Sequence, residues 1–289
     1  MVHSASLALL WLATAVTGRT VPHRRDAACP RSFLQNITSQ YVAAQSGGKR
    51  ATLQTLASNV TYIENDITVD VTKAVLNQPM KIDHNRSFHD TTQCAALTEI
   101  IVTDPKAPYV IHTRFLADAA TRKVTTVDSL VTKPGDWAFN ATGYLYWDSL
   151  ENWDPIPADK RDSRAVIKAA GDAYFDRFDN ASVVVPMGTP CARLEGGAYT
   201  GRGNLTANTC DIGGFPDNIK VTNRRYIIDE VEGVVDIFEG FPGLDRSVPT
   251  TPAPDSHLFR VENGKLRYIH TVSHCINAGC GMNGTLFGR

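Results

Sequence analysis

The sequence predicts an α+β protein in which a unit of one helix followed by antiparallel strands occurs twice. Residues 33–45 and 163–178 carry apolar side chains at helical spacing. Each helical segment precedes several strand-like segments rich in β-branched residues. The order of elements in residues 30–135 matches the order in residues 163–280, which indicates an internal duplication.

The first copy begins with FLQNITSQYVAAQ, which places Phe33, Ile37 and Tyr41 on one helix face. A polar break at Gly47-Gly48 ends it. LASNVTYIEN then reads as a short helix or turn that enters a strand. Further strands are predicted at residues 95–103, 108–116 and 122–131.

The second copy follows a connector of different composition. Residues 136–162 carry five tryptophan and tyrosine side chains, followed by the turn-forming run Asp154-Pro155-Ile156-Pro157. We therefore expect an ordered connector packed by its aromatic residues. Ser163 is the expected helix cap of the second copy. The segments SVVVP, CARLEGGAYTG and VTNRRYIIDEVEGVVDIFEGF follow and read as strands and turns, and then comes a hairpin.

Three alignments relate the two copies. They match Tyr41 with Tyr174, residues 62–65 with 193–196, and residues 126–130 with 268–272. The alternative is that any two α+β halves can be aligned this loosely.

The last segment, HLFRVENGKLRYIH at 257–270, is predicted to be a hairpin about Asn263-Gly264, because both turn residues favour positive φ. Counting outward from this turn pairs Glu262 with Lys265 and finally His257 with His270. Side chains alternate between faces, so the count places both histidines and Tyr268 together on one apolar face.

Composition limits the class of protein. The chain is 43% hydrophobic and has a net charge of −1 from 29 basic and 30 acidic residues. It also lacks a basic cluster with interleaved aromatic residues, so we expect no nucleic-acid partner.

The beginning of the chain predicts export. Residues 1–18 have a short apolar run that ends in small residues, as a cleaved signal peptide does; an uncleaved anchor is the minor alternative. Arg24-Arg25 is either a dibasic processing site or a solvated basic pair. After signal cleavage we expect no membrane contact and a location in the secretory pathway or outside the cell. Seven glycosylation acceptors agree with this location, at Asn36, Asn59, Asn85, Asn140, Asn180, Asn204 and Asn283.

Six cysteines in such a compartment predict disulfides, with many possible pairings. We favour Cys191–Cys210 and Cys275–Cys280, which are close in sequence, and Cys29–Cys94 then remains. The spacing of cysteine and histidine shows no zinc motif.

The motifs RLEGG, RRYIIDEVEGVVDIFEGF and DSHLFRVENGKLRYIHTV resemble the end of a ketosteroid-isomerase-like fold, also called nuclear transport factor 2-like or SnoaL-like. The resemblance covers roughly residues 30–280 and is most specific in the second half. It implies two tandem cone domains, in which a curved sheet surrounds a deep pocket. With its signal peptide and cysteines, the chain is similar to secreted fungal proteins of this type, some of which are assigned as dimerising cyclases in maleidride biosynthesis.

Two histidines are the leading catalytic candidates. His270 and His257 titrate near neutral pH, so one could remove a carbon-bound proton and the other could return it. The alternative is that both are structural. Arg193 could bind a carboxylate or anhydride oxygen, or form a salt bridge to Glu195 or Asp229.

Carboxylates are the second group of candidates. Asp229 and Tyr226 lie on opposite faces of one strand, and periodicity alone does not decide which face lines the pocket. A solvated acidic pair at 229–230 is the alternative. Glu64 and Asp128 are the candidates in the first copy, and Tyr268 and Tyr226 join Arg193 as expected substrate-binding residues.

No other catalytic signature is present: the sequence has no nucleophile elbow, zinc-protease helix, phosphate loop or dinucleotide fingerprint. We expect chemistry that needs no cofactor and no metal. What the resemblance implies is a cyclase that couples two maleic-anhydride monomers derived from a polyketide, with a possible second pathway protein. The alternatives are a secreted carrier or host-interaction protein, or an isomerase or dehydratase that acts on a polyketide intermediate.

Overall fold

The computed structural model describes residues 29–211 and 214–280, together with Met1. The predicted signal peptide, Arg24-Arg25 and Asn283 lie outside these residues. The described chain forms two tandem α+β domains, each with one six-stranded sheet. The first domain consists of α1 (Arg31–Gly47), β1 (Leu56–Glu64), β2 (Ile67–Thr68), β3 (His84–Asp90), β4 (Ala95–Val102), β5 (Tyr109–Asp118) and β6 (Lys123–Thr132).

The second domain repeats this order. It consists of α3 (Arg164–Asp179), β7 (Met187–Glu195), β8 (Ala198–Tyr199), β9 (Thr222–Asp229), β10 (Val234–Phe241), β11 (Ala253–Glu262) and β12 (Lys265–Ser273). Helix α2 (Ala141–Asp148) lies in the connector. Short 3-10 turns occur at Arg50–Thr52, Val75–Asn77, Ala158–Lys160 and Thr200–Gly203.

The two sheets have the same strand order, β2-β1-β6-β5-β4-β3 and β8-β7-β12-β11-β10-β9. Each contains one parallel pair, β1 with β6 and β7 with β12, so the sheets are mixed and not wholly antiparallel as expected. The predicted alignment of the copies is confirmed by register, because Ile63 pairs with Asp128 as Leu194 pairs with His270.

Local chemistry accounts for both long helices. Ser163 caps α3 by accepting a hydrogen bond from the N–H of Val166, as predicted. Helix α1 is followed by Gly48, whose φ of 59° favours glycine. Each helix buries one face against its own sheet, with Tyr41 in α1 and Tyr174 in α3 fully buried.

The predicted hairpin forms, but its register corrects the expected pairing. Asn263 and Gly264 have φ values of 53° and 69°, and Glu262 pairs with Lys265. Beyond that point Arg267 is left out of the pairing, so His257 pairs with Thr271 and His270 pairs with Leu258. An extra residue in one strand is a β-bulge, and a one-residue shift moves side chains to the opposite face. The prediction that the two histidines share a face was therefore wrong.

The first domain has a bulge at the equivalent place. There Leu116 pairs with Thr126 and Ala117 pairs with Val124, which leaves out Thr125. Because both sheets shift at matching positions, the bulge is a feature of the repeated unit.

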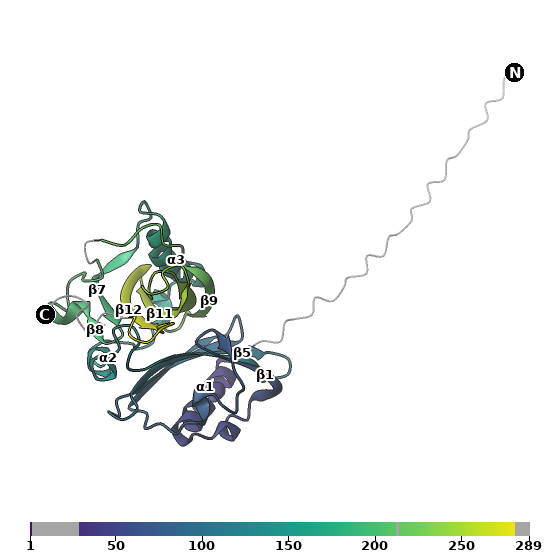
Figure 1. Cartoon of the computed structure of the whole chain (residues 1–289). Helices are drawn as coiled ribbons and strands as arrows, with labels where there is room; N and C mark the ends of the chain where they lie inside the picture. The colour runs from purple at the N-terminus through teal and green to yellow at the C-terminus, as the bar shows by residue number, and fades with distance from the viewer. Residues whose placement is uncertain (2–28, 212–213, 281–289) are drawn as a thin grey trace.

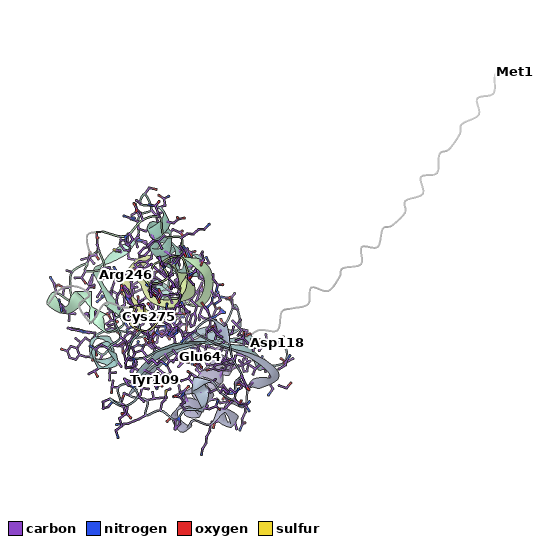
Figure 2. All side chains as sticks on the ribbon, in the orientation of Figure 1. Met1, Glu64, Tyr109, Asp118, Arg246 and Cys275 are labelled. Atoms are coloured by element: carbon purple, nitrogen blue, oxygen red, sulfur yellow. A yellow bond between two sulfur atoms is a disulfide. The ribbon has the colours of Figure 1, made fainter. Side chains whose placement is uncertain are left out.

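The two domains pack sheet against sheet. Each sheet has a helix face, which packs on α1 or α3, and an interface face, which packs on the other domain. Figure 1 shows the first sheet between α1 and the second domain. Leu97 and Phe88 of the first domain share an apolar cluster with Phe238 and Leu258 of the second. Side chains from both domains fill the space between the ribbons (Figure 2).

A reciprocal pair of ion pairs joins the domains. Arg31 of α1 binds Asp229 of β9 through two 2.8 Å hydrogen bonds, and Arg164 of α3 binds Asp90 of β3 at 2.8 and 2.7 Å. Each carboxylate also accepts a backbone N–H from the edge strand of the other domain, at 2.7 and 2.9 Å. Equivalent residues exchange equivalent contacts, as at the interface of a two-fold symmetric dimer.

The three favoured disulfides are present: Cys29–Cys94, Cys191–Cys210 and Cys275–Cys280. Such bonds are typical of proteins that fold in an oxidising compartment. All six acceptor asparagines in the described residues are exposed, at Asn36, Asn59, Asn85, Asn140, Asn180 and Asn204. No helix in residues 29–211 or 214–280 is long and apolar enough to cross a membrane.

Candidate functional site

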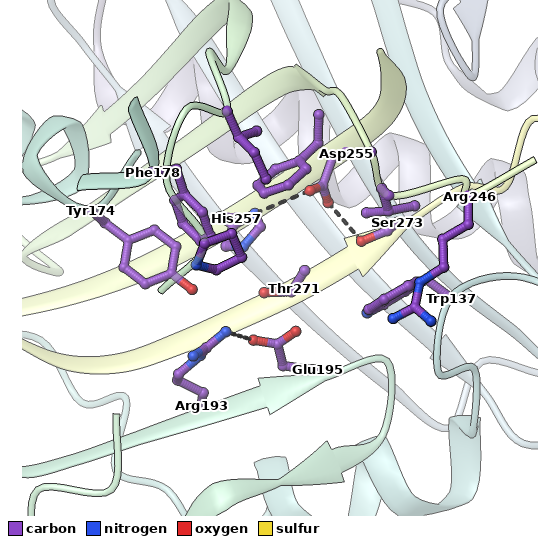
Figure 3. Close-up of a pocket in the computed structure, with 15 residues that line it drawn as sticks. Trp137, Tyr174, Phe178, Arg193, Glu195, Arg246, Asp255, His257, Thr271 and Ser273 are labelled. Atoms are coloured by element: carbon purple, nitrogen blue, oxygen red, sulfur yellow. Dashed lines mark hydrogen bonds and ion pairs between the residues drawn. The ribbon is translucent and has the colours of Figure 1, made fainter. Parts of the chain in front are cut away.

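A cavity of about 280 Å³ lies in the second domain, between α3 and the helix face of its sheet (Figure 3). Its apolar wall comes from aromatic and aliphatic residues, including Tyr174, Phe178, Ile219, Phe241 and Leu244. Polar side chains from β7, β11 and β12 enter from the sheet, namely Arg193, Glu195, Asp255, His257, Thr271 and Ser273. The cavity therefore combines an apolar wall with a compact polar floor.

His257 is at the centre of this floor. Its Nδ1 atom lies 2.7 Å from Oε1 of Glu239 and 3.6 Å from Oδ2 of Asp255. The rings of Phe175 and Phe259 pack around the imidazole. Burial, with the positive charge of Arg193, holds the pKa of His257 well below its usual range, so the imidazole is neutral.

The two neighbouring carboxyl groups are protonated more readily than usual. Burial, with the nearby Asp255 and Asp236, raises the pKa of Glu239 well above its ordinary value. Burial also raises the pKa of Asp255, to about 8, although Ser273 donates a 2.8 Å hydrogen bond to it. A carboxyl group with this pKa can gain or lose a proton near neutral pH.

Arg193 forms a buried ion pair with Glu195 through Nη2. This is the salt bridge that the sequence left as an alternative to substrate binding. The Nε and Nη1 atoms of Arg193 are buried and have no partner, so the guanidinium can still donate to a ligand. Its carbon lies 5.6 Å from the centre of the Tyr174 ring.

Several other buried polar atoms of the cavity also lack hydrogen-bond partners. They are the Tyr174 hydroxyl, Oδ2 of Asp255 and the Thr271 hydroxyl. A buried polar group without a partner costs about 1–3 kcal/mol, so native proteins rarely retain several in one place. Together with the remaining nitrogens of Arg193, these atoms could bond to a polar ligand or to water in the cavity.

The same floor has ligand atoms suited to a cation. Glu239, Asp255 and His257 each offer one atom, and these atoms lie within 4.8 Å of one another. Two carboxylates and one imidazole suit divalent ions such as Mn²⁺ or Zn²⁺. These three residues would hold such an ion.

The first domain does not repeat this chemistry. Strand register matches four ionisable positions of the second domain with uncharged residues: His257 with Thr113, Asp255 with Ile111, Glu239 with Ile100 and Arg193 with Tyr62. The hydroxyl of Thr113 bonds to Tyr41 at 2.7 Å and to Ser129 at 3.0 Å, and Ser129 reaches Tyr62 at 3.3 Å. These groups satisfy one another. Among the ionisable residues of the floor, Glu195 alone has a carboxylate counterpart in the first domain, Glu64.

His270 lies on the interface face and outside the cavity. Its Nε2 atom is 2.6 Å from Oε2 of Glu151, and its Nδ1 atom is 3.5 Å from Oε1 of Glu99. Although burial lowers the pKa of His270, these carboxylates raise it to about 10. His270 is therefore a charged member of the domain interface.

The remaining predicted residues also lie outside the cavity. Asp229 binds Arg31 across the interface. Glu64 accepts the backbone N–H of residue 75 in the first domain, at 2.9 Å. The Tyr268 hydroxyl accepts the backbone N–H of residue 152 at 3.1 Å, and Tyr226 donates to an aspartate of α3 at 2.7 Å. Of the predicted set, His257 and Arg193 alone line the cavity.

Sequence reasoning missed Glu239 and Asp255 as site residues. Both carried a usable signal. Asp255 is two residues before His257 and so lies on the same strand face. Glu239 is a carboxylate inside the apolar run VVDIFEGF, where a charged residue needs a partner or a proton.

Comparison with known proteins adds one match. A family model described as "Domain of unknown function (DUF8021)" matches residues 160–273, which span the second domain from just before α3 to the end of β12. The matched segment contains every ionisable residue of the cavity. No curated protein matches the chain.

Proposed function

We propose that the second domain is an enzyme that moves a proton within a small oxygen-bearing organic substrate, using its own side chains as acid and base. The observation that carries the proposal is the buried His257, hydrogen-bonded to Glu239 and facing unpartnered polar atoms in a cavity with an apolar wall. Groups with displaced pKa values in a cavity favour acid–base catalysis.

The residues have distinct roles in this proposal. His257 takes a proton from a carbon next to a carbonyl group, and the carbonyl oxygen gains the negative charge. The Tyr174 hydroxyl and the free nitrogens of Arg193 donate hydrogen bonds to that oxygen. Asp255, protonated below its pKa of about 8, returns a proton to a different carbon. The double bond moves, and no atom is lost.

The proposal also includes the ketosteroid-isomerase-like cone fold, secretion and a role in maleidride biosynthesis. The repeated helix-and-sheet unit, the disulfides and the exposed acceptor asparagines support the first two. Coupling of two maleic-anhydride monomers uses the same first step, carbanion formation. The cavity of about 280 Å³ is at or below the lower end of ligand pockets, roughly 300–1,000 Å³, and therefore favours one small substrate at a time. We accordingly place an isomerase ahead of the dimerising cyclase.

The test is exchange of carbon-bound hydrogen with deuterium, followed by NMR. The glycosylated protein is incubated in D₂O with small enones, lactones and an alkyl maleic anhydride. We expect exchange with at least one compound, a loss of 100-fold or more in His257→Gln, and no change in the control His84→Gln, which lies at the half-exposed rim of β3. Binding without exchange in any compound would instead support a carrier, and equal rates in His257→Gln would remove the proposed base.

A further inference from the structure

Two carboxylates face each other on the helix face of the second sheet. Glu239 of β10 pairs directly with Asp255 of β11, and both side chains are buried. Like charges directly opposite each other on neighbouring strands destabilise a sheet. Their basic neighbour is His257, whose Nδ1 atom lies 2.7 Å from Oε1 of Glu239 and 3.6 Å from Oδ2 of Asp255. A proton or a cation held between the two carboxylates would remove the repulsion.

The first domain shows that the repeated unit does not need these charges. Ile100 and Ile111 occupy the positions of Glu239 and Asp255 there, and they pair with each other in the same way. Both belong to the apolar core that packs on α1. Burying a carboxylate costs free energy that an isoleucine does not cost. The pair of carboxylates in the second domain is therefore not explained by folding of the unit, which favours a role in binding.

Several polar atoms around the pair have no hydrogen-bond partner. They include Oε2 of Glu239 and Oδ2 of Asp255, both buried. Thr271 pairs with His257 across β11 and β12, and the ring centre of Tyr174 lies 5.5 Å from that of His257. The hydroxyls of Thr271 and Tyr174 are buried and also lack partners. Figure 3 shows both residues beside His257 in the cavity, where their hydroxyls can hydrogen-bond to water ligands of an ion.

We propose that Glu239, Asp255 and His257 form a binding site for one divalent transition-metal ion, with water molecules completing its coordination. Their ligand atoms lie within 4.8 Å of one another. Ligands held at about 2.0–2.2 Å from one ion lie about 3–4 Å apart, so the 3.6 Å distance fits and the 2.7 Å distance needs to open slightly. Two carboxylates and one imidazole suit Zn²⁺ or Mn²⁺.

The surroundings of the site suit an ion with water ligands. Asp255 and His257 line the cavity of about 280 Å³, which has room for those waters. The charge of the ion would replace the repulsion between the two carboxylates by attraction to both. Motif spacing in the sequence predicted no metal, because these ligands meet only through the pairing of β10 with β11.

An occupied site and the proposed base exclude each other. A neutral imidazole that binds an ion through Nδ1 carries its proton on Nε2, so His257 then has no lone pair with which to take a proton. A bound ion would therefore inhibit the proposed enzyme. The existence of the site does not depend on that function.

Isothermal titration of the full glycosylated chain with Zn²⁺ and with Mn²⁺, after removal of metal by EDTA, tests the site. We expect one ion per chain. Glu239→Gln and Asp255→Asn each remove a ligand charge and keep the shape of the side chain, and each should weaken binding at least about 100-fold. The control His84→Gln removes a ligand of a different cluster, formed with Glu99 and Asp148 at the domain interface, and should bind as tightly as the parent protein.

Absence of binding in the parent protein, or equal affinity in the parent and in Glu239→Gln, would overturn the proposal. If the variants do not fold, crystals of the parent protein are soaked in Zn²⁺ and the ion is located by its anomalous scattering. A peak between Glu239, Asp255 and His257 is the expected result. No peak there, or a peak only beside Asp148, which two interface clusters share, would equally overturn it.

These measurements need no turnover, so failure of the proposed function leaves their result intact. If the parent protein does catalyse deuterium exchange, saturating Zn²⁺ should suppress that exchange. Exchange that continues at full occupancy would show that His257 is not the base, while binding at the three residues would still stand.

Discussion

Two buried imidazolium groups make the stability of this protein sensitive to alkaline pH. His270 and His112 lie at the domain interface with pKa values raised to about 10 and about 9. In the unfolded chain both return to about 6.5. A raised histidine pKa stabilises the fold fully below pH 6.5, and this contribution disappears as the pH rises through the folded-state value.

The loss of stability caused by His270 is best measured above pH 8, where Asp255 contributes little. Asp255, with its pKa raised to about 8, also lowers stability as pH rises, but mainly below pH 8. Between pH 8 and 10, deprotonation of His270 alone should lower the free energy of unfolding by about 2 kcal/mol. Each pH unit below the folded-state pKa corresponds to about 1.4 kcal/mol. His112 adds to this loss, though not in full, since both histidines share Glu99.

Urea unfolding at pH 8, 9 and 10, followed by tryptophan fluorescence, measures this loss. We expect the midpoint to fall steadily across the series. A variant that removes the ion pair without leaving a buried charge, His270→Gln combined with Glu151→Gln, should be less stable at pH 8 and should show a flatter dependence. A midpoint in the parent protein that stays constant from pH 8 to 10 would refute the assignment of charge to both histidines.

Two further predictions concern the interface and a turn. Arg164→Met and Arg31→Met should each lower the free energy of unfolding by about 2–3 kcal/mol in urea, because each leaves a buried aspartate without its arginine. The arginine side chains are 26% exposed, which limits the cost. Costs that differ severalfold would contradict the equivalence of the two ion pairs. Gly196→Ala should lower stability by at least about 2 kcal/mol, because φ is 57° and a Cβ atom would lie 2.4 Å from the Trp137 carbonyl oxygen. The control Gly203→Ala should change stability little, because no atom lies within 4 Å of the added Cβ. Thermal unfolding of the two alanine variants side by side checks the second prediction, and equal melting temperatures would contradict it.

Local sequence predicted the elements well because their causes are local. The spacing of apolar residues indicates both long helices, Ser163 marks the start of α3, and Asn263-Gly264 forms the turn of the last hairpin. The order of elements also revealed the duplication, which the shared strand order and the reciprocal ion pairs confirm.

The site was only partly predictable, because its members come from separate strands. His257 and Arg193 line the cavity as expected, whereas Asp229 and Glu64 have structural partners elsewhere. Which carboxylates lie beside His257 depends on the pairing of β10 with β11. The register of that pairing cannot be read from the sequence of either strand alone.

The sequence by itself determined both long helices, most of the strands, the repeat and the residue types available for chemistry, but it did not indicate β3 or helix α2. Tertiary structure alone decided which face each residue occupies. A single unpaired residue, Arg267, reverses the two faces of β12 relative to the simple count, because side chains alternate with a period of two. It directs His270 into the interface while His257 remains in the cavity, and so separates two histidines that the sequence placed side by side.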